Sequence, residues 1–382
     1  MNKTDNLKVL ITGNGNLTVR DGNFFVHHEI AAFLREMRAL GLKTEYATIV
    51  LDAGDEAVKN LADEKFPADI PVHTFKSLSH MPRWKRPFAT PAAVAKAAFL
   101  VMRYDFVYCY YPGALGRMIA FFCRLLHRRY GLNVRGEVPP TRMDRSALDK
   151  ASFILADGAC NVTRVIPEYK HCCEIVPMCA IFNEDIAPVE RDFSNVELHG
   201  LFVGRVERNK GMFELFEAMA ELKRRGVAVR MKLVGAYGEE MPKEVRRLDI
   251  ADRIDFAGLA KDPETLKGFY RDADFFCLPT YTEGFPRVLY EAMAHGLPCL
   301  TTLVGGIPSR MHAGENCLAL EPRSADSIVR AITSIVEDRE LAKRLSAAST
   351  ETFRYWQKRF AGSSHSLQLR DMIFKSRGEK CC

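Results

Sequence analysis

Short apolar runs alternate with longer stretches of helical periodicity along this chain. In the first half, apolar runs that end in glycine or polar residues predict strands, and residues 23–40 carry apolar side chains at helical spacing. The same alternation resumes at about residue 198. Strands that alternate with helices form parallel sheets covered on both faces, so we predict an α/β protein. The strands expected in the first half are Leu7–Thr12, Thr44–Leu51, Phe106–Tyr110, Leu132–Val134 and Phe153–Leu155.

The chain length predicts two domains. A chain of 382 residues is long for one hydrophobic core and comfortable for two. Residues 183–195 contain Pro188 and mixed charges, which is typical of a hinge. We therefore expect an N-terminal domain over 1–190 and a C-terminal domain over 191–363. In the second domain we expect strands over 201–204, 229–234, 254–258 and 275–278, and helices over 212–225 and 266–272.

The segment 279–298 carries the most informative chemistry. It follows the buried run Phe275–Leu278 and holds two carboxylates, Glu283 in a loop and Glu291 about one turn inside an expected helix. One of them can face a reacting centre while the other accepts hydrogen bonds from a ligand's hydroxyl groups. The alternative interpretation is that Glu283 caps the helix and Glu291 is an ordinary solvated residue.

The start of this expected helix favours an anionic ligand. Pro286 suits the first helical position, where the missing N–H of proline costs nothing. The N-terminus of a helix offers unpaired N–H groups and the positive end of its dipole, which suits a phosphate. The N–H groups expected around this helix start belong to Gly284, Phe285, Arg287 and Val288.

A second segment, Leu201–Gly211, predicts a strand followed by a polar loop. Arg205 and Lys210 lie in that loop, at the carboxyl end of the strand, where open α/β sheets bind ligands. Arginine offers a fork of donors and lysine a mobile point charge, and both suit a diphosphate. The alternative is that they are two ordinary surface cations.

Together these residues resemble the signature of family-four retaining glycosyltransferases. That family has the GT-B fold, in which two Rossmann-like domains with parallel sheets face each other across a cleft. The resemblance is densest over residues 199–320. It implies that Glu283 lies beside the donor sugar and Glu291 binds the ribose of the nucleotide. It also implies that Arg205 and Lys210 bind the diphosphate that leaves.

The resemblance also implies further donor contacts and a domain crossing. The base would lie against backbone near Leu259, the loop at Gly22 would face the donor, and a last helix over 364–376 would cross back to the first domain. Further residues of the donor site would be Gly284, Phe285, Val288 and Gly235, the last in a glycine turn that ends a strand.

Two residues depart from the family pattern. Pro286 stands where a glycine is commoner, and Arg135 takes the place of a histidine that many relatives carry after this strand. Arg135 either holds an anionic sugar or acceptor or pairs with a nearby acid. The N-terminal domain, which selects the acceptor, is therefore where the resemblance transfers least.

The implied reaction is transfer of a hexose from a UDP- or GDP-linked sugar to a glycan or lipid-linked saccharide in cell-surface polysaccharide synthesis. We expect no cofactor, and no metal, because no Asp-x-Asp cluster is placed for one and the cations take its role. Alternatives are another GT-B enzyme, such as a sugar-nucleotide epimerase or a phosphorylase, and a non-catalytic sugar-nucleotide binder.

Charge is concentrated in one stretch. Residues 80–135 hold ten cations and one acid, Asp105, while the whole chain is +6. The helix expected over 119–129 is apolar nearly all round and ends in basic residues, which favours an anionic membrane surface. The alternative is that Phe121, Phe122, Leu125 and Leu126 are core residues. Nucleic acid is not expected, because no nucleic-acid motif accompanies the charge.

Composition suggests the compartment. No apolar run approaches the ~18 residues of a spanning helix, and the polar start over 1–6 predicts no signal peptide. Eleven cysteines without regular spacing favour free thiols in a reducing compartment. We expect a cytoplasmic protein, peripheral on the inner face of the membrane. Lipidation of Cys381-Cys382 is a less favoured alternative.

Overall fold

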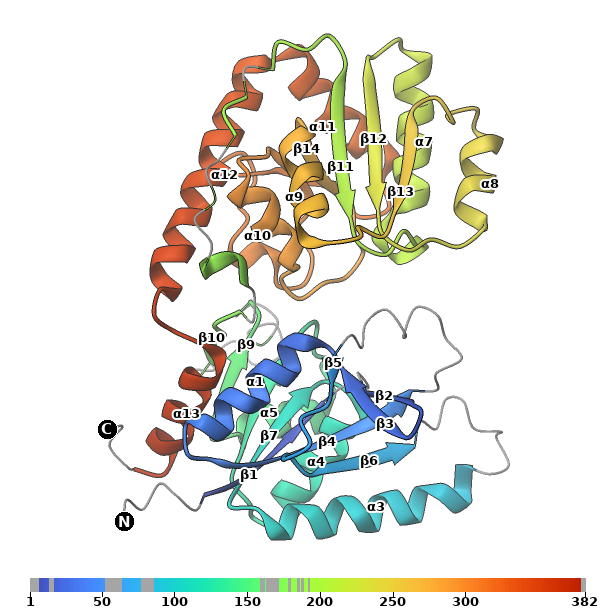
Figure 1. Cartoon of the computed structure of the whole chain (residues 1–382). Helices are drawn as coiled ribbons and strands as arrows, with labels where there is room; N and C mark the ends of the chain where they lie inside the picture. Colours follow the sequence, from blue (N-terminus) through green and yellow to red (C-terminus); the bar gives the residue numbers. More distant parts are fainter. Residues whose placement is uncertain are drawn as a thin grey trace. The chain divides into compact units, whose positions relative to one another are not determined.

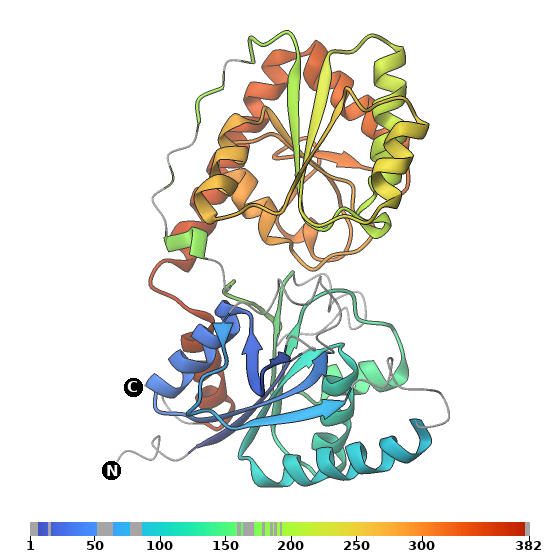
Figure 2. The same ribbon diagram turned by 45° about the vertical axis from the view of Figure 1, so that its right-hand side comes forward.

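The computed structural model divides the chain into two compact units, one of residues 1–178 with 362–382 and the other of 179–361. The sequence placed these boundaries at 190/191 and 363/364. Each unit is a sheet flanked by helices (Figures 1 and 2). The structure describes residues 7–13, 17–51, 64–76, 86–158, 162, 172–177, 180–183, 186, 189–191 and 193–378.

The N-terminal unit is built on a parallel sheet in the order β10-β9-β8-β7-β1-β4, with β6 also paired to β4. Five of its strands are those that the apolar runs predicted. The pairing is in parallel register, for example Leu10 opposite Val107. The bounds are β1 Lys8–Thr12, β4 Lys43–Leu51, β6 Val72–Lys76, β7 Phe106–Tyr111, β8 Tyr130–Val134, β9 Phe153–Ala156 and β10 Cys172–Glu174.

A hairpin replaces the first part of the helix predicted over 23–40. Strands β2 (Leu17–Arg20) and β3 (Asn23–Val26) pair antiparallel, and β5 (Glu64–Lys65) pairs with β3. Asp21 and Gly22 both have positive φ, 48° and 73°, which is the backbone of a two-residue hairpin turn. The prediction was wrong here because the spacing of a short apolar run does not separate a strand from a helix. Helix α1 spans His28–Ala39.

Helices cover both faces of this sheet. Side chains that alternate along β7 divide between two cores: Val107 and Cys109 point to one, and Phe106 and Tyr108 to the other. On the second face α13 lies beside α1, although the two are far apart in sequence (Figure 1). The first face is covered by α3 Arg86–Arg103, α4 Ala114–Leu125 and α5 Arg142–Asp149, and the second by α1 and α13 His365–Ser376.

The C-terminal unit is an all-parallel sheet in the order β13-β12-β11-β14-β15-β16. Strand β14 is a continuous apolar run because both of its faces are buried, and the four predicted strands are confirmed. Helix α7 packs against α11, and α10 against α12. The strands are β11 Leu198–Val203, β12 Val229–Val234, β13 Ile254–Gly258, β14 Phe275–Leu278, β15 Cys299–Thr302 and β16 Leu318–Leu320. The helices are α7 Met212–Arg224, α8 Glu240–Arg247, α9 Pro263–Asp272, α10 Arg287–Ala294, α11 Ala325–Glu337 and α12 Arg339–Phe360.

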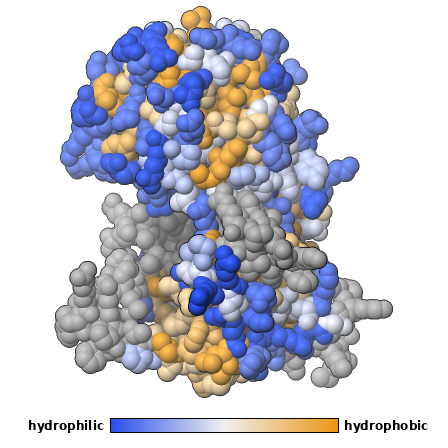
Figure 3. Space-filling model, turned by 180° about the vertical axis from the view of Figure 1, so that it is seen from behind, coloured by the Kyte–Doolittle hydropathy of each residue, from blue (hydrophilic) through white to orange (hydrophobic). Residues whose placement is uncertain are grey.

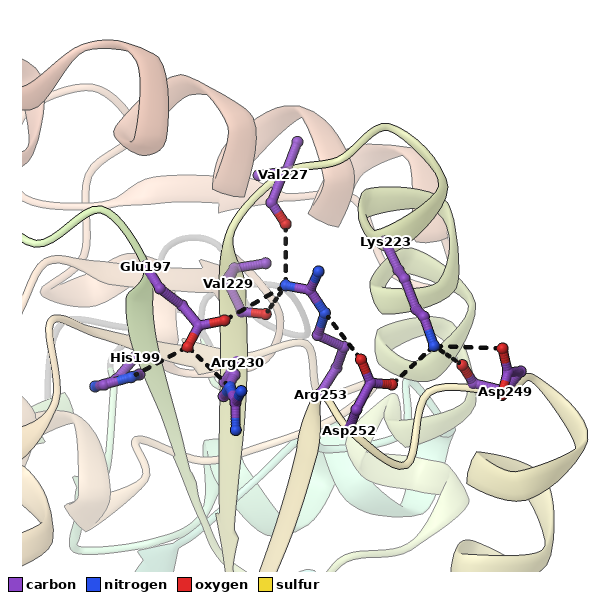
Figure 4. A network of polar contacts seen from close by, with 9 residues as sticks. All are labelled: Glu197, His199, Lys223, Val227, Val229, Arg230, Asp249, Asp252 and Arg253. Carbon is purple, nitrogen blue, oxygen red and sulfur yellow. Dashed lines mark hydrogen bonds and ion pairs between the residues drawn. The ribbon is translucent and has the colours of Figure 1, made fainter.

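A network of ion pairs lies at the amino ends of β11, β12 and β13 (Figure 4). Glu197 lies 2.8 Å from Arg230 and 3.6 Å from Arg253, which also donates to two backbone carbonyls at the entry to β12. Asp252 continues the network to Lys223 at 2.8 Å. Exposed pairs contribute at most about 1 kcal/mol each. They tie together the sheet edge opposite to the one that carries the predicted ligand loops.

A buried histidine joins α13 to the N-terminal sheet. The Nε2 of His365 lies 3.3 Å from the Tyr108 hydroxyl, and its ring lies 4.8 Å from that of Phe33. Burial, together with the nearby Arg135 cation, lowers the pKa of His365 to about 3. The folded protein therefore holds this ring neutral at every physiological pH.

This burial predicts an acid-sensitive contact. An unfolded histidine has a pKa near 6.5 and the folded one is near 3, so the folded state binds fewer protons and its stability falls as pH drops below 6.5. We expect a loss of about 2 kcal/mol between pH 7 and pH 5. His365→Asn cannot titrate and should remove that part of the dependence. Hydrogen exchange of the α13 amides at both pH values checks this; equal slopes in the two proteins would contradict it.

Candidate functional site

The order of strands in the C-terminal sheet reverses between β11 and β14. From β11 the chain adds β12 and β13 on one side, and then β14, β15 and β16 on the other. Loops that leave neighbouring strands in opposite directions open a crevice at the carboxyl edge, and open α/β sheets bind ligands there. The two loops that flank this point are those that follow β11 and β14.

These loops bring Lys210 and Glu283 together. Lys210 ends a short 3-10 turn after β11, and its ammonium forms an ion pair with a carboxylate oxygen of Glu283. Their side chains are only 16% and 19% exposed. Arg205 does not join them: its side chain is 60% exposed and pairs with Glu207 at 3.1 Å. The structure thus pairs Lys210 with Glu283 and leaves Arg205 exposed to solvent.

Glu291 is held by a tyrosine from the neighbouring helix. It lies on α10, and the hydroxyl of Tyr270 on α9 donates to its Oε2 at 2.7 Å. The sequence predicted Pro286 as the first residue of this helix, and that prediction was wrong. Pro286 precedes the helix and has extended backbone, with ψ 133°. The helix begins at Arg287, one position later than expected.

Phe285 anchors the loop between the two glutamates. Its ring is buried and lies 4.6 Å from the ring of Tyr290 and 4.6 Å from the guanidinium of Arg310. Arg310 is itself buried, and also lies over Trp356 at 4.8 Å. A guanidinium is attracted to the face of an aromatic ring. The side chain of Phe285 is therefore core, and its backbone is the part available to a ligand.

Three glycines let one backbone lie directly against another at this edge. A Cβ on Gly211 would come within 3.0 Å of the Pro279 carbonyl, and one on Gly235 would meet the Gly204 carbonyl. A Cβ on Gly305 would overlap the backbone of Glu283. The structure shows that what approaches Gly305 is the loop that carries Glu283.

The other predicted donor residues belong to several different elements. Leu259 follows β13 with its side chain 53% exposed, and Gly284 accepts from the N–H of Gly306 at 3.0 Å. Val288 is on the first turn of α10 and is partly buried. Gly22 is in the β2–β3 turn of the N-terminal unit.

Arg135 follows β8 in the N-terminal unit and is partly buried. Its N–H donates to the Tyr111 carbonyl at 3.2 Å, and its guanidinium lies close enough to Tyr108 and His365 to affect the pKa of each. Among the residues that the structure describes, none places a carboxylate on it. The described residues therefore offer no acid that pairs with Arg135.

Arg191 is a positioning residue that the sequence did not suggest. Its guanidinium donates to the carbonyls of Tyr270 and Ala273 at the end of α9, each at 2.8 Å, and to that of His295 at the end of α10. Burial lowers its pKa to about 10, so it stays charged. It thus joins the two helices that carry Tyr270 and Glu291. Its partners are backbone atoms distant in sequence, so no motif could reveal it.

Tyr281 joins the two loops at the strand reversal. Its N–H donates to the Asn209 carbonyl at 2.9 Å, and its hydroxyl lies 2.6 and 2.7 Å from the two carboxylate oxygens of Glu214 on α7. Burial and this hydrogen bond raise the pKa of Tyr281 to about 12, so the hydroxyl remains a donor. Asn209 precedes Lys210, and this contact therefore fixes the lysine's backbone.

Metal-binding chemistry is not evident in the described residues. Across the described parts of both units, no group of three or more His, Cys, Asp or Glu side chains is placed to hold a metal ion. The charged groups at the strand reversal are instead a lysine, an arginine and carboxylates. Such a set can bind an anion through its cations and hydroxyl groups through its carboxylates.

The backbone contact at Gly305 predicts a specific loss of stability. Gly305→Ala places a methyl group where the Glu283 backbone lies, at φ 56°, and should lower the free energy of unfolding by about 2–3 kcal/mol. Gly314→Ala is the matched control, because φ is also positive at 77° but nothing lies within 4 Å. Urea unfolding of both full-length variants measures the difference. Equal losses would mean that backbone strain, not the contact, limits this position.

Comparison with known proteins finds similarity in the C-terminal unit. Residues 194–352 match the family described as Glycosyl transferases group 1. A D-inositol 3-phosphate glycosyltransferase of Corynebacterium jeikeium is 33% identical over 149 residues, 37% of this chain and 35% of that protein. The putative colanic acid biosynthesis glycosyltransferase WcaL of Salmonella typhimurium is 33% identical over 127 residues, 31% of each chain. The chain thus matches about a third of the length of these relatives.

The fold of the whole chain is also found among solved structures. Anabaena HepE, solved in complex with UDP and glucose, superposes with a TM-score of 0.65 at 18% identity and covers 97% of this chain and 99% of its own. At that identity the likeness establishes the fold. It confirms the predicted pair of Rossmann-like units, and the family match agrees with the family-four resemblance. Residues 194–352 are therefore similar to the group 1 glycosyltransferases, and the chain as a whole has the GT-B fold.

Proposed function

We propose that this chain is a retaining hexosyltransferase. It moves a sugar from a UDP- or GDP-linked donor to a glycan or lipid-linked saccharide during cell-surface polysaccharide synthesis. The observation that carries the proposal is the Lys210–Glu283 pair, which lies at the strand reversal of a group 1 domain. The polysaccharide assignment is supported by the description of WcaL, and the donor class by the UDP bound in HepE.

Donor binding uses the two loops at the strand reversal. Lys210 has three donors on one ammonium, so it can keep its bond to Glu283 while it binds a phosphate oxygen. Arg205, more exposed, binds the diphosphate from the rim. Glu291, oriented by Tyr270, accepts hydrogen bonds from the ribose hydroxyl groups. The base lies against backbone near Leu259.

Transfer breaks the bond between the anomeric carbon and the diphosphate oxygen. The acceptor oxygen forms the new bond on the same face, and its proton passes to the departing diphosphate. Negative charge develops on the diphosphate, and Arg205 and Lys210 stabilise it more in the transition state than in the bound donor. Glu283, held by Lys210, positions the sugar. No metal or cofactor is required in this scheme, because the cations supply the positive charge.

The N-terminal unit selects the acceptor in this proposal. Arg135, partly buried and close to Tyr108 and His365, offers a fixed cation at the end of β8. An acceptor with a phosphate or carboxylate group suits such a cation. We place the protein on the cytoplasmic side of the membrane, where nucleotide sugars are the available donors.

Removal of either charge of the Lys210–Glu283 pair should abolish most transfer. Lys210→Ala loses charge stabilisation of the leaving group, and Glu283→Gln loses the group that orients the sugar, so acceptor-dependent release of UDP or GDP should fall about 100-fold or more. Lys223→Ala is the matched control, since that lysine makes an ion pair at the opposite sheet edge. Assays use UDP- and GDP-sugars with soluble and polyprenol-linked saccharide acceptors.

The same assay separates the alternatives. An epimerase changes the sugar nucleotide without an acceptor, and a phosphorylase requires inorganic phosphate. A non-catalytic binder would raise its melting temperature with UDP or GDP yet show no turnover with any donor. Turnover that persists in both variants would refute the assigned site.

The stereochemistry and metal requirement form a separate prediction. Attack on the face from which the diphosphate leaves keeps the donor's anomeric configuration, which the anomeric proton coupling in NMR spectra of the product reports. Since Arg205 and Lys210 supply the charge, EDTA should leave the rate within about two-fold of the untreated enzyme. An inverted product, or a rate lost with EDTA and restored by Mg²⁺, would contradict the mechanism.

A further inference from the structure

Helix α3 exposes apolar side chains on the face that points away from the core. Ala97, Leu100 and Val101 are buried against the sheet. On the opposite side, Phe99 and Met102 are each 54% exposed. A helix that packs on one face normally shows charged residues on the other. The outer face of α3 is therefore more apolar than is usual for a helix face exposed to water.

Helix α4 continues this apolar surface. Phe121 is 43% exposed and Leu125 is 60% exposed, and α4 packs beside α3. Figure 3 shows hydrophobic side chains gathered along the lower edge of the N-terminal unit, where α3 runs in Figure 1. We call the set the α3–α4 surface; it consists of Val94, Phe99, Met102, Phe121 and Leu125.

This surface resolves an alternative that the sequence left open. The four apolar residues of the basic helix were expected either to be core or to meet a membrane. Phe122 and Leu126 are partly buried and pack against the core, whereas Phe121 and Leu125 face outward. The helix is therefore apolar on two faces and uses only one of them for folding.

The charged side chains of the two helices have a single sign. Arg103 lies over the ring of Phe99 at 5.4 Å, and Arg124 lies over that of Phe121 at 5.9 Å. Lys96 adds a third cation, and neither α3 nor α4 contains an aspartate or glutamate. Two of the ten cations counted over 80–135, Arg83 and Lys85, lie outside the described residues. A partner that fits must offer an apolar interior and negative charge at its surface.

We propose that the α3–α4 surface binds an anionic lipid bilayer. Phe99, Met102, Phe121 and Leu125 lie at the acyl boundary, and the flanking cations lie among the headgroup phosphates. A second copy of this chain fits poorly, because a symmetric contact would bring like charges face to face. In the described residues no helix is long and apolar enough to cross a membrane, so the contact is to one bilayer surface. This inference rests on the proposed function, because a membrane contact would bring the enzyme to a lipid-linked acceptor.

Vesicle flotation of the full chain tests the proposal. We expect binding to vesicles of phosphatidylcholine with 30% phosphatidylglycerol, and at least ten-fold weaker binding to phosphatidylcholine alone or in high salt. Phe121→Ser with Leu125→Ser should weaken binding at least ten-fold, as should Arg103→Glu with Arg124→Glu. Val196→Ser with Tyr355→Ser is the control, since both are exposed apolar residues of the C-terminal unit. Circular dichroism confirms that each variant is folded.

The outcomes distinguish this proposal from the one on catalysis. Lys210→Ala should lose transfer but float with vesicles as the unchanged protein does, whereas the surface variants should keep transfer to a soluble acceptor. Flotation that is unchanged in both surface variants overturns the membrane proposal. So does a serine variant that converts a dimer to a monomer in size-exclusion chromatography, because the occupant would then be a second copy.

Discussion

Direct contact of one backbone with another holds the carboxyl edge of the C-terminal sheet. Gly211, in the loop after β11, packs against the backbone of Pro279 in the loop after β14, and Gly305 packs against the backbone of Glu283. Main chain is the stiffest part of a protein, and no side chain has to be ordered to make these contacts. Lys210 directly precedes one glycine, and Glu283 is the residue against the other. Packing of the main chain therefore positions Lys210 and Glu283.

This arrangement explains why the two edges of the same sheet carry charge so differently. At the amino edge, exposed pairs such as Lys223–Asp252 join neighbouring elements and are individually weak. At the carboxyl edge, Lys210 and Glu283 are mostly removed from solvent, and removal of one partner leaves the other with its desolvation uncompensated. A pair in that state is ready to bind a ligand that offers both a negative group and hydroxyl groups. Arg191 acts indirectly, because it binds carbonyl groups at the ends of α9 and α10, the helices that carry Tyr270 and Glu291.

The sequence predicted strand β14 well because the strand is buried along its length and appears as an uninterrupted apolar run, Phe275–Leu278. It failed at residues 23–26, where a turn with two residues of positive φ makes a hairpin out of a run that also fits a helix. Lys210 and Glu283 were both candidates, but their pairing across 73 positions needs the strand order. Arg191 and Arg310 were not candidates at all, since they bind carbonyls and aromatic faces that no local pattern records.

The division of the chain into two units also divides its chemistry. The family match begins at residue 194, so it covers the unit with the strand reversal and the Lys210–Glu283 pair. The N-terminal unit lies outside the range of the family match, and it carries two further features: the partly buried cation Arg135 and the apolar, cationic α3–α4 surface. A transferase acting on a lipid-linked acceptor needs its acceptor-selecting unit at the bilayer, because the acceptor cannot leave it. Both features lie on the same unit, and together they fit the proposal of an anionic, lipid-linked acceptor.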